Sequence, residues 1–161
     1  MANALTVTRF ICALAVCLLL ERKLYGEALL VFVAGALTDL LDGLLARKLF
    51  RPTLRGALLD PLADKALVLM PLYVLAEQGR ADGLLSALLA LRELVISYLR
   101  AEVPLRPSAL AKLKTAVSFT AVGLAIAGSR LSAPALAAAV LLAYASAVSY
   151  AGALKDEREA S

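Results

Sequence analysis

Apolar segments of similar length recur along the whole chain, and short charged or Pro- and Gly-containing connections separate them. A helix needs about 20 residues to cross the hydrocarbon core of a membrane, and most of these segments have about that length. They are rich in Leu and Ala, with few runs of β-branched residues, which favours helices over the strands of a membrane barrel. We therefore expect an all-α integral membrane protein in which residues 1–161 form a single domain of about six transmembrane helices. The predicted segments are Leu5–Leu20, Tyr25–Ala46, Leu58–Ala76, Gly83–Leu99, Leu110–Ala127 and Ser132–Leu154.

The basic residues of the connections predict how the helices are oriented. Short loops on the cytoplasmic side of a membrane carry an excess of Lys and Arg. The connections on one side hold four such residues, and those on the other side, together with the end of the chain, hold nine. We therefore expect both termini and the second and fourth connections to face the cytoplasm, in a multi-pass protein of the cell (inner) membrane. The four are Arg22, Lys23, Arg80 and Arg130, and the nine are Lys48, Arg51, Arg55, Arg100, Arg106, Lys112, Lys114, Lys155 and Arg158.

The composition narrows the possible chemistry. Hydrophobic residues make up 61% of the 161 residues and charged residues 19%, whereas soluble domains are about 45–50% apolar and about a quarter charged. The chain has no His and two Cys, which excludes Ser-His-Asp triads, Cys-His pairs, His-based zinc sites and a disulfide framework. Catalysis must therefore depend on carboxylates, Lys, Arg, Tyr, Ser or Thr. The net charge of +4 comes from basic residues that flank the spans and form no stripe, so we expect no nucleic-acid partner.

Four aspartates interrupt the second and third apolar segments. Asp39 and Asp42 lie three residues apart near the end of the second segment. Asp60 and Asp64 lie four residues apart at the start of the third. Residues three or four apart share one face of a helix. A short connection joins the two helices, so we expect antiparallel neighbours whose four carboxylates converge at one membrane depth, on the cytoplasmic side.

Such a cluster is costly unless something neutralises it. A single carboxylate at mid-bilayer costs about 2.5–3.5 kcal/mol on insertion scales, and like charges repel each other. All-oxygen ligands without His or Cys favour hard cations, so we expect the four aspartates to hold two Mg²⁺ or Mn²⁺ ions, or Ca²⁺. Two other interpretations stay open. The acids can pair with Arg47, Arg55 and Lys65 in a purely structural role, or they can form the site of a divalent-cation transporter.

Small and basic residues between the acids favour a phosphate-transfer site over an ion pathway. Gly43, Ala46 and Gly56 leave room for a ligand close to the backbone, although small residues also pack membrane helices together. Arg47 can bind phosphate in bidentate fashion. Its alternative role is that of an interfacial residue whose side chain reaches toward water.

The spacing of these residues resembles the signature of the CDP-alcohol phosphotransferase family. All eight signature positions are present in Asp39-x2-Asp42-Gly43-x2-Ala46-Arg47-x8-Gly56-x3-Asp60-x3-Asp64. The resemblance implies an enzyme that transfers a substituted phosphate group from a CDP-alcohol, often CDP-diacylglycerol, to an acceptor hydroxyl and releases CMP. It implies that the four aspartates are metal ligands and that Asp64 is also the general base. The CDP donor is expected against the first aspartate and the non-acidic signature positions, namely Asp39, Gly43, Ala46, Arg47 and Gly56.

Within the family, the chain is most similar to members whose acceptor is glycerol 3-phosphate. That similarity implies phosphatidylglycerophosphate and CMP as products, in phospholipid biosynthesis, and a homodimer among membrane lipids. Members that make cardiolipin or inositol-phosphate lipids remain the alternative. The residues that carry the similarity are Asn3-x2-Thr6-x2-Arg9, the run 59–65, Arg92-Glu93-x6-Arg100 and Ser108-x3-Lys112-x-Lys114-Thr115.

Basic residues of the fourth and fifth segments form the candidate acceptor site. Arg92 and Glu93 lie well inside an apolar segment, which is costly unless they face a polar cavity or form a salt bridge. Adjacent helical residues point about 100° apart, so we expect these two not to pair readily with each other. Arg100, Lys112 and Lys114 lie at cytoplasmic helix ends and can anchor them. Together with Arg92 they can instead bind the phosphate of an anionic acceptor.

Overall fold

The computed structural model of the chain is built from helices joined by short connections. It describes the backbone of residues 2–49, 54–102 and 109–159 and the side chains of residues 7–38, 65–98 and 113–147. All six predicted helices are present, and the described backbone contains no strand. The helices are α1 (Ala2–Glu21), α2 (Tyr25–Leu49), α3 (Leu54–Glu77), α4 (Gly83–Glu102), α5 (Ala109–Ile126) and α6 (Ser132–Glu159).

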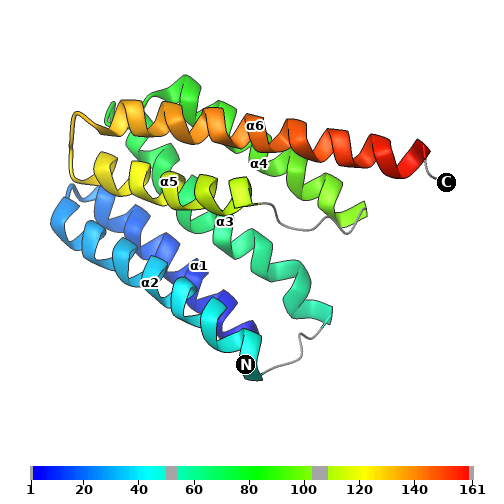
Figure 1. Ribbon diagram of the computed structural model, residues 1–161. Coiled ribbons are helices and arrows are strands. Elements are labelled where there is room, and N and C mark those ends of the chain that lie inside the picture. Colours follow the sequence, from blue (N-terminus) through cyan, green and yellow to red (C-terminus); the bar gives the residue numbers. More distant parts are fainter. Residues whose placement is uncertain (1, 50–53, 103–108, 160–161) are drawn as a thin grey trace.

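The helices run alternately up and down a single bundle. Figure 1 shows α1 and α2 on one side, α4 and α6 on the opposite side, and α3 and α5 between them. In the described residues α1 packs most extensively against α3, and α5 packs against α6. α2 and α3 are antiparallel neighbours, as expected, but in the described residues α3 packs far more extensively against α1 than against α2.

Three helices end in the same kind of turn at one end of the bundle. Two residues after α1, α3 and α5, the chain adopts a positive φ, of 59° at Lys23 and 70° at both Gly79 and Gly128. The next amide can then bond back into the last helical turn, which satisfies a carbonyl that the helix itself leaves open. These bonds run from Leu24 N to Leu19 O (2.9 Å), from Arg80 N to Leu75 O (2.8 Å) and from Ser129 N to Leu124 O (2.9 Å).

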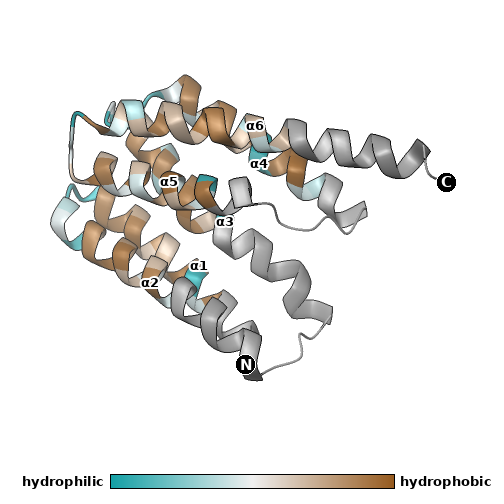
Figure 2. Ribbon diagram, viewed as in Figure 1, coloured by the Kyte–Doolittle hydropathy of each residue, from teal (hydrophilic) through white to brown (hydrophobic). Residues whose placement is uncertain are grey.

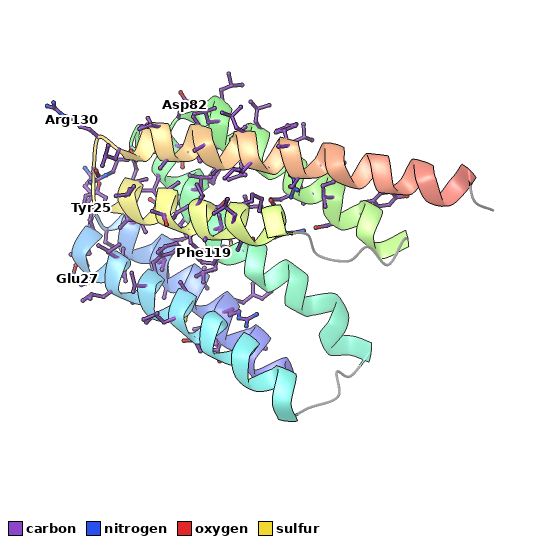
Figure 3. All side chains as sticks on the ribbon, viewed as in Figure 1. Tyr25, Glu27, Asp82, Phe119 and Arg130 are labelled. Carbon is purple, nitrogen blue, oxygen red and sulfur yellow. The ribbon has the colours of Figure 1, made fainter. Side chains whose placement is uncertain are left out.

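Side chains tie these three turns together. The guanidinium carbon of Arg80 lies 3.7 Å from the ring centroid of Tyr25. The Tyr25 hydroxyl donates a hydrogen bond to Gln78 Oε1 (3.3 Å), and Gln78 Nε2 donates to the carbonyl of Leu20 (2.9 Å). A Cβ atom on Gly128 would collide with the Arg80 guanidinium, so the third turn packs directly on the same side chain. We call these five residues the loop clasp; Figure 3 shows Tyr25 at this end of the bundle.

The space between the helices is filled by apolar side chains, and the outside of the bundle is also apolar. Figure 2 shows hydrophobic positions along the described helices and hydrophilic ones near the loop clasp. Large exposed apolar residues are frequent on α1 and α4. The largest buried side chains include Val16, Leu20, Leu67, Leu72, Leu75, Leu89, Val122 and Ile126.

Within the described residues, no helix is both long enough and apolar enough to cross a membrane. The prediction of six helices is confirmed. The prediction that they span a membrane stays a prediction.

Candidate active site

The helices place the predicted acids away from the loop clasp. Asp39 and Asp42 lie in the second half of α2, and Asp60 and Asp64 lie in the first half of α3. The predicted donor positions share these two stretches: Gly43, Ala46 and Arg47 are in α2, and Gly56 is in α3. All eight side chains lie outside those that the structure describes. Among the side chains it does describe, no group of three or more acids or cysteines could hold a metal.

A close approach of α2 to α3 lies one turn from these acids. A Cβ atom on Gly35 would lie 3.2 Å from Leu67 Cδ2 and 3.5 Å from Cys12 Cβ, so a glycine lets the three helices meet. Asp39 follows Gly35 by four residues, and Asp64 precedes Leu67 by three. Positions three or four apart share a helix face. The backbone positions of Asp39 and Asp64 therefore continue the two faces that meet at Gly35 and Leu67.

A buried ionic network occupies the centre of α4. Arg92 is 5% exposed and Glu93 is 9% exposed. Arg92 Nη1 lies 3.1 Å from Glu93 Oε1, and the ammonium of Lys114 on α5 binds the same oxygen. The expectation that Arg92 and Glu93 do not pair readily is therefore wrong. Both side chains are long enough to bend toward Lys114, and a shared ionic partner outweighs the 100° between their starting directions.

Arg92 uses all three of its side-chain nitrogens. Besides the contact with Glu93, Arg92 Nε donates to the carbonyl of Ala143 (2.8 Å), and Nη2 donates to the hydroxyl of Ser146. Both acceptors are on α6, and Ser146 is fully buried. A buried guanidinium is costly unless its donors are paired. Arg92 therefore links α4 firmly to α6.

The same stretch of α4 also holds α3. Lys65 Nζ donates to the main-chain carbonyl of Glu93 (3.0 Å), and the Ser97 hydroxyl donates to the same carbonyl (2.8 Å). Lys65 directly follows Asp64 in α3. The helix turn that carries the predicted general base is thus attached to α4 at Glu93.

Two members of this network cannot be recognised as such from the sequence. The sequence suggests Lys65 only as a counter-ion for the acids, and it assigns Ser146 no role. A lysine next to a predicted catalytic acid and a serine in the Ala-rich middle of α6 are the available signals. Neither signal says which helix is the partner.

One known protein family matches the chain over most of its length. The family model described as CDP-alcohol phosphatidyltransferase matches residues 1–150. The chain belongs to the CDP-alcohol phosphatidyltransferase family. The matched region contains all four aspartates and the whole ionic network.

Relatives in this family have names that agree with one another. The chain is 39% identical over 102 residues to a CDP-diacylglycerol--glycerol-3-phosphate 3-phosphatidyltransferase of Wigglesworthia glossinidia brevipalpis, a match that covers 58% of the chain and 56% of the relative. It is 35% identical over 139 residues to a protein of the same name from Rickettsia typhi, covering 80% of the chain and 76% of the relative. It is 38% identical over 138 residues to a probable phosphatidylglycerophosphate synthase of Mycobacterium tuberculosis, covering 78% and 65%.

The predicted acceptor residues of this CDP-alcohol phosphatidyltransferase are divided between described and undescribed side chains. Arg92 and Lys114 meet at Glu93 in the ionic network. Arg100 follows Arg92 by eight residues on α4, and Lys112 precedes Lys114 by two on α5. Their side chains lie outside the described set, so the assignment of an acceptor site to these four residues stays a prediction.

Proposed function

We propose that the protein transfers the phosphatidyl group of CDP-diacylglycerol to glycerol 3-phosphate, which yields phosphatidylglycerophosphate and CMP for phospholipid biosynthesis. The match of the CDP-alcohol phosphatidyltransferase model over residues 1–150 carries this proposal. The shared name of the relatives from Wigglesworthia and Rickettsia supports the choice of acceptor.

The four aspartates are suited to hold two Mg²⁺ or Mn²⁺ ions. Carboxylate oxygens are the ligands that such hard cations prefer. α2 and α3 approach closely at Gly35 and Leu67, one helical turn from Asp39 and Asp64, which supports a shared site for the two pairs of acids. Divalent ions held by these aspartates would supply neutralising charge for the pyrophosphate of the donor and for the departing CMP. Arg47, which follows Asp42 by five residues on α2, binds a nucleotide phosphate in bidentate fashion.

The protein's own residues divide the chemistry between donor and acceptor sides. Asp64 takes the proton from the 1-hydroxyl of glycerol 3-phosphate, and that oxygen attacks the phosphorus next to the lipid. The bond from this phosphorus to the CMP oxygen breaks, so no covalent enzyme intermediate is needed. The phosphate of the acceptor is held by basic side chains of α4 and α5, among them Lys114.

We also propose that this chemistry takes place at the cytoplasmic face of the cell membrane, with six membrane-spanning helices and both termini in the cytoplasm. A mean hydropathy of +0.81 and the large exposed apolar side chains on α1 and α4 support a lipid environment. CDP-diacylglycerol has two acyl chains, and an enzyme embedded beside them can leave these chains in the bilayer. A homodimer is proposed on the family resemblance alone.

CMP release by the purified full chain tests the proposal. The assay contains Mg²⁺ and CDP-diacylglycerol and is run with and without glycerol 3-phosphate. We expect CMP release that requires glycerol 3-phosphate. Asp60→Asn should abolish this release. Glu77→Gln, a control at an exposed position on α3, should leave it unchanged. Release with inositol phosphate or phosphatidylglycerol in place of glycerol 3-phosphate would keep the family and change the acceptor. A folded protein that releases no CMP with any acceptor, and that carries Mn²⁺ into liposomes, would be a transporter instead.

A further inference from the structure

One residue of α4 gathers contacts from two other helices, and its neighbour Arg92 adds a third. The Glu93 carboxylate binds Lys114 of α5 and its neighbour Arg92, and its main-chain carbonyl accepts from Lys65 of α3. Arg92 then continues the network to Ser146 of α6. Glu93 is thus the point at which the helix of the predicted base and a helix of the predicted acceptor site are attached to each other.

The two cations that share Glu93 Oε1 are not equivalent. Each side-chain nitrogen of Arg92 donates a hydrogen bond to a partner on α4 or α6, and the residue is 5% exposed. Its guanidinium has a fixed planar shape, so it cannot turn toward a substrate without giving up these bonds. Lys114 ends in an ammonium with three donors on a flexible stem, and such a group can hold a carboxylate and a phosphate oxygen at once.

We propose that Glu93 is a positioning residue for the acceptor: it fixes the Lys114 ammonium for the phosphate of glycerol 3-phosphate, while Arg92 braces the carboxylate against α6 and does not bind the acceptor. The inference rests on the proposed function. The sequence suggests that Arg92 binds the acceptor, whereas this inference makes Arg92 a residue that holds Glu93 in place.

Charge and geometry both favour this division of roles. Lys114 and Arg92 are like charges that meet at one oxygen, and the carboxylate between them is what keeps them together in a buried place. Without that carboxylate Lys114 loses the ionic partner that sets its position against α4, whereas Arg92 is still held at Ala143 and Ser146. A displaced ammonium weakens acceptor binding and leaves the binding of the CDP donor unaffected.

The test measures the KM for each substrate separately in the CMP-release assay, using the full chain. We expect Glu93→Gln to raise the KM for glycerol 3-phosphate about tenfold and to change the KM for CDP-diacylglycerol by less than about twofold. Lys114→Met should do the same, and the double variant should be no worse than Lys114→Met alone, because Glu93 acts through Lys114. Glu27→Gln serves as the matched control. It removes an exposed carboxylate at the end of the bundle that carries the loop clasp, where Figure 3 labels Glu27.

Several outcomes overturn the inference. One is an unchanged KM for glycerol 3-phosphate in Glu93→Gln, and another is an equal rise in both KM values. A third is a double variant in which the two single-variant increases in the KM for glycerol 3-phosphate multiply, because Glu93 would then not act through Lys114. If Glu93→Gln does not fold, Glu93→Asp keeps the charge but shortens the side chain, and it should show the same selective rise; if neither folds, Glu93 has a structural role only. A wild-type protein that releases no CMP with glycerol 3-phosphate refutes the proposed function as well, whereas an active wild type with an unaffected Glu93→Gln refutes only this inference.

Discussion

The ammonium of Lys65 on α3 lies 3.0 Å from the main-chain carbonyl oxygen of Glu93 on α4. This bond attaches the turn next to Asp64 to the helix that carries the ionic network. A charged donor on a buried carbonyl contributes about 1.5–3 kcal/mol. The bond also helps to position Asp64, because Asp64 is the residue next to Lys65 in α3.

Replacement of Lys65 by Met should therefore lower the rate more than the affinity. We expect kcat for CMP release to fall at least about tenfold with KM values changed little, since a small displacement of a general base is costly to the rate. Arg130→Met removes an exposed positive charge at the loop end and should leave kcat unchanged. A Lys65→Met enzyme with normal kcat would show that the attachment does not position Asp64.

Replacement of Asp64 by Asn should abolish CMP release without unfolding the protein. Asn cannot accept the proton of the acceptor hydroxyl, and the substitution removes one of four like charges whose repulsion opposes folding. The melting temperature of the metal-free protein should be unchanged or higher. Measurable turnover by Asp64→Asn would assign the general base to another residue.

Removal of divalent metal ions by a chelator should abolish the activity of the wild-type protein reversibly. We expect EDTA to stop CMP release and either Mg²⁺ or Mn²⁺ to restore it, because an all-carboxylate site selects hard cations. Ca²⁺ is the informative comparison, since it accepts more ligands at longer distances and is less suited to a site shaped for Mg²⁺. Activity that persists after exhaustive chelation would contradict a metal role for the aspartates.

Replacement of Ser146 by Ala should destabilise the bundle. It leaves Arg92 Nη2 without the hydroxyl that accepts its hydrogen bond in a buried place, at a cost of about 1.5–3 kcal/mol in the free energy of unfolding. Thr120→Ala is the matched control, because that exposed hydroxyl bonds only the carbonyl of Ala116 on its own helix. We expect the control to change stability by less than about 0.5 kcal/mol. Equal losses of stability in the two variants, measured by thermal unfolding, would show that the bond from Arg92 to Ser146 does not stabilise the bundle.

The two glycines with a φ of 70° should differ in their tolerance of alanine. Both Gly79→Ala and Gly128→Ala introduce a side chain into a left-handed turn, at about 1–2 kcal/mol. Nothing lies within 4 Å of a Cβ on Gly79, whereas a Cβ on Gly128 displaces Arg80 from the ring of Tyr25. Gly128→Ala should therefore cost about 0.5–1 kcal/mol more. The difference should vanish in an Arg80→Met background, and its persistence there would point to a different cause.

Helix positions were predictable from the sequence because the length of each apolar segment is decisive. The predicted segment Gly83–Leu99 corresponds to α4 at Gly83–Glu102, and Ser132–Leu154 corresponds to α6 at Ser132–Glu159. α6 continues past Leu154 because Lys155, Glu157 and Arg158 are good helix formers. Composition alone does not reveal this, since charged residues end an apolar segment without ending a helix.

The partners of each helix were much harder to predict. Most of these helices are apolar on several sides, so periodicity does not select a buried face, and the packing of α1 on α3 could not be foreseen. The prediction that the acids act together rests on their spacing, which a helix converts directly into a shared face. The ionic network was not predictable in this way, because the meeting of Glu93 with Lys114 depends on how α4 and α5 are placed in three dimensions.

The loop clasp gives the molecule one stiff end. Arg80 and Gln78 cross-link the turns after α1, α3 and α5, and the helices extend from there toward the end that carries the predicted acids. A helix that is fixed at one end moves most at the other, so small tilts of α2 near the loop clasp become larger displacements near Asp39. Next to Asp64, by contrast, the bond from Lys65 to Glu93 ties α3 to α4 a second time. Under the proposed function, α2 is therefore the helix whose movement would admit a two-tailed lipid at the end of the predicted acids, while the loop clasp preserves the register of the helices.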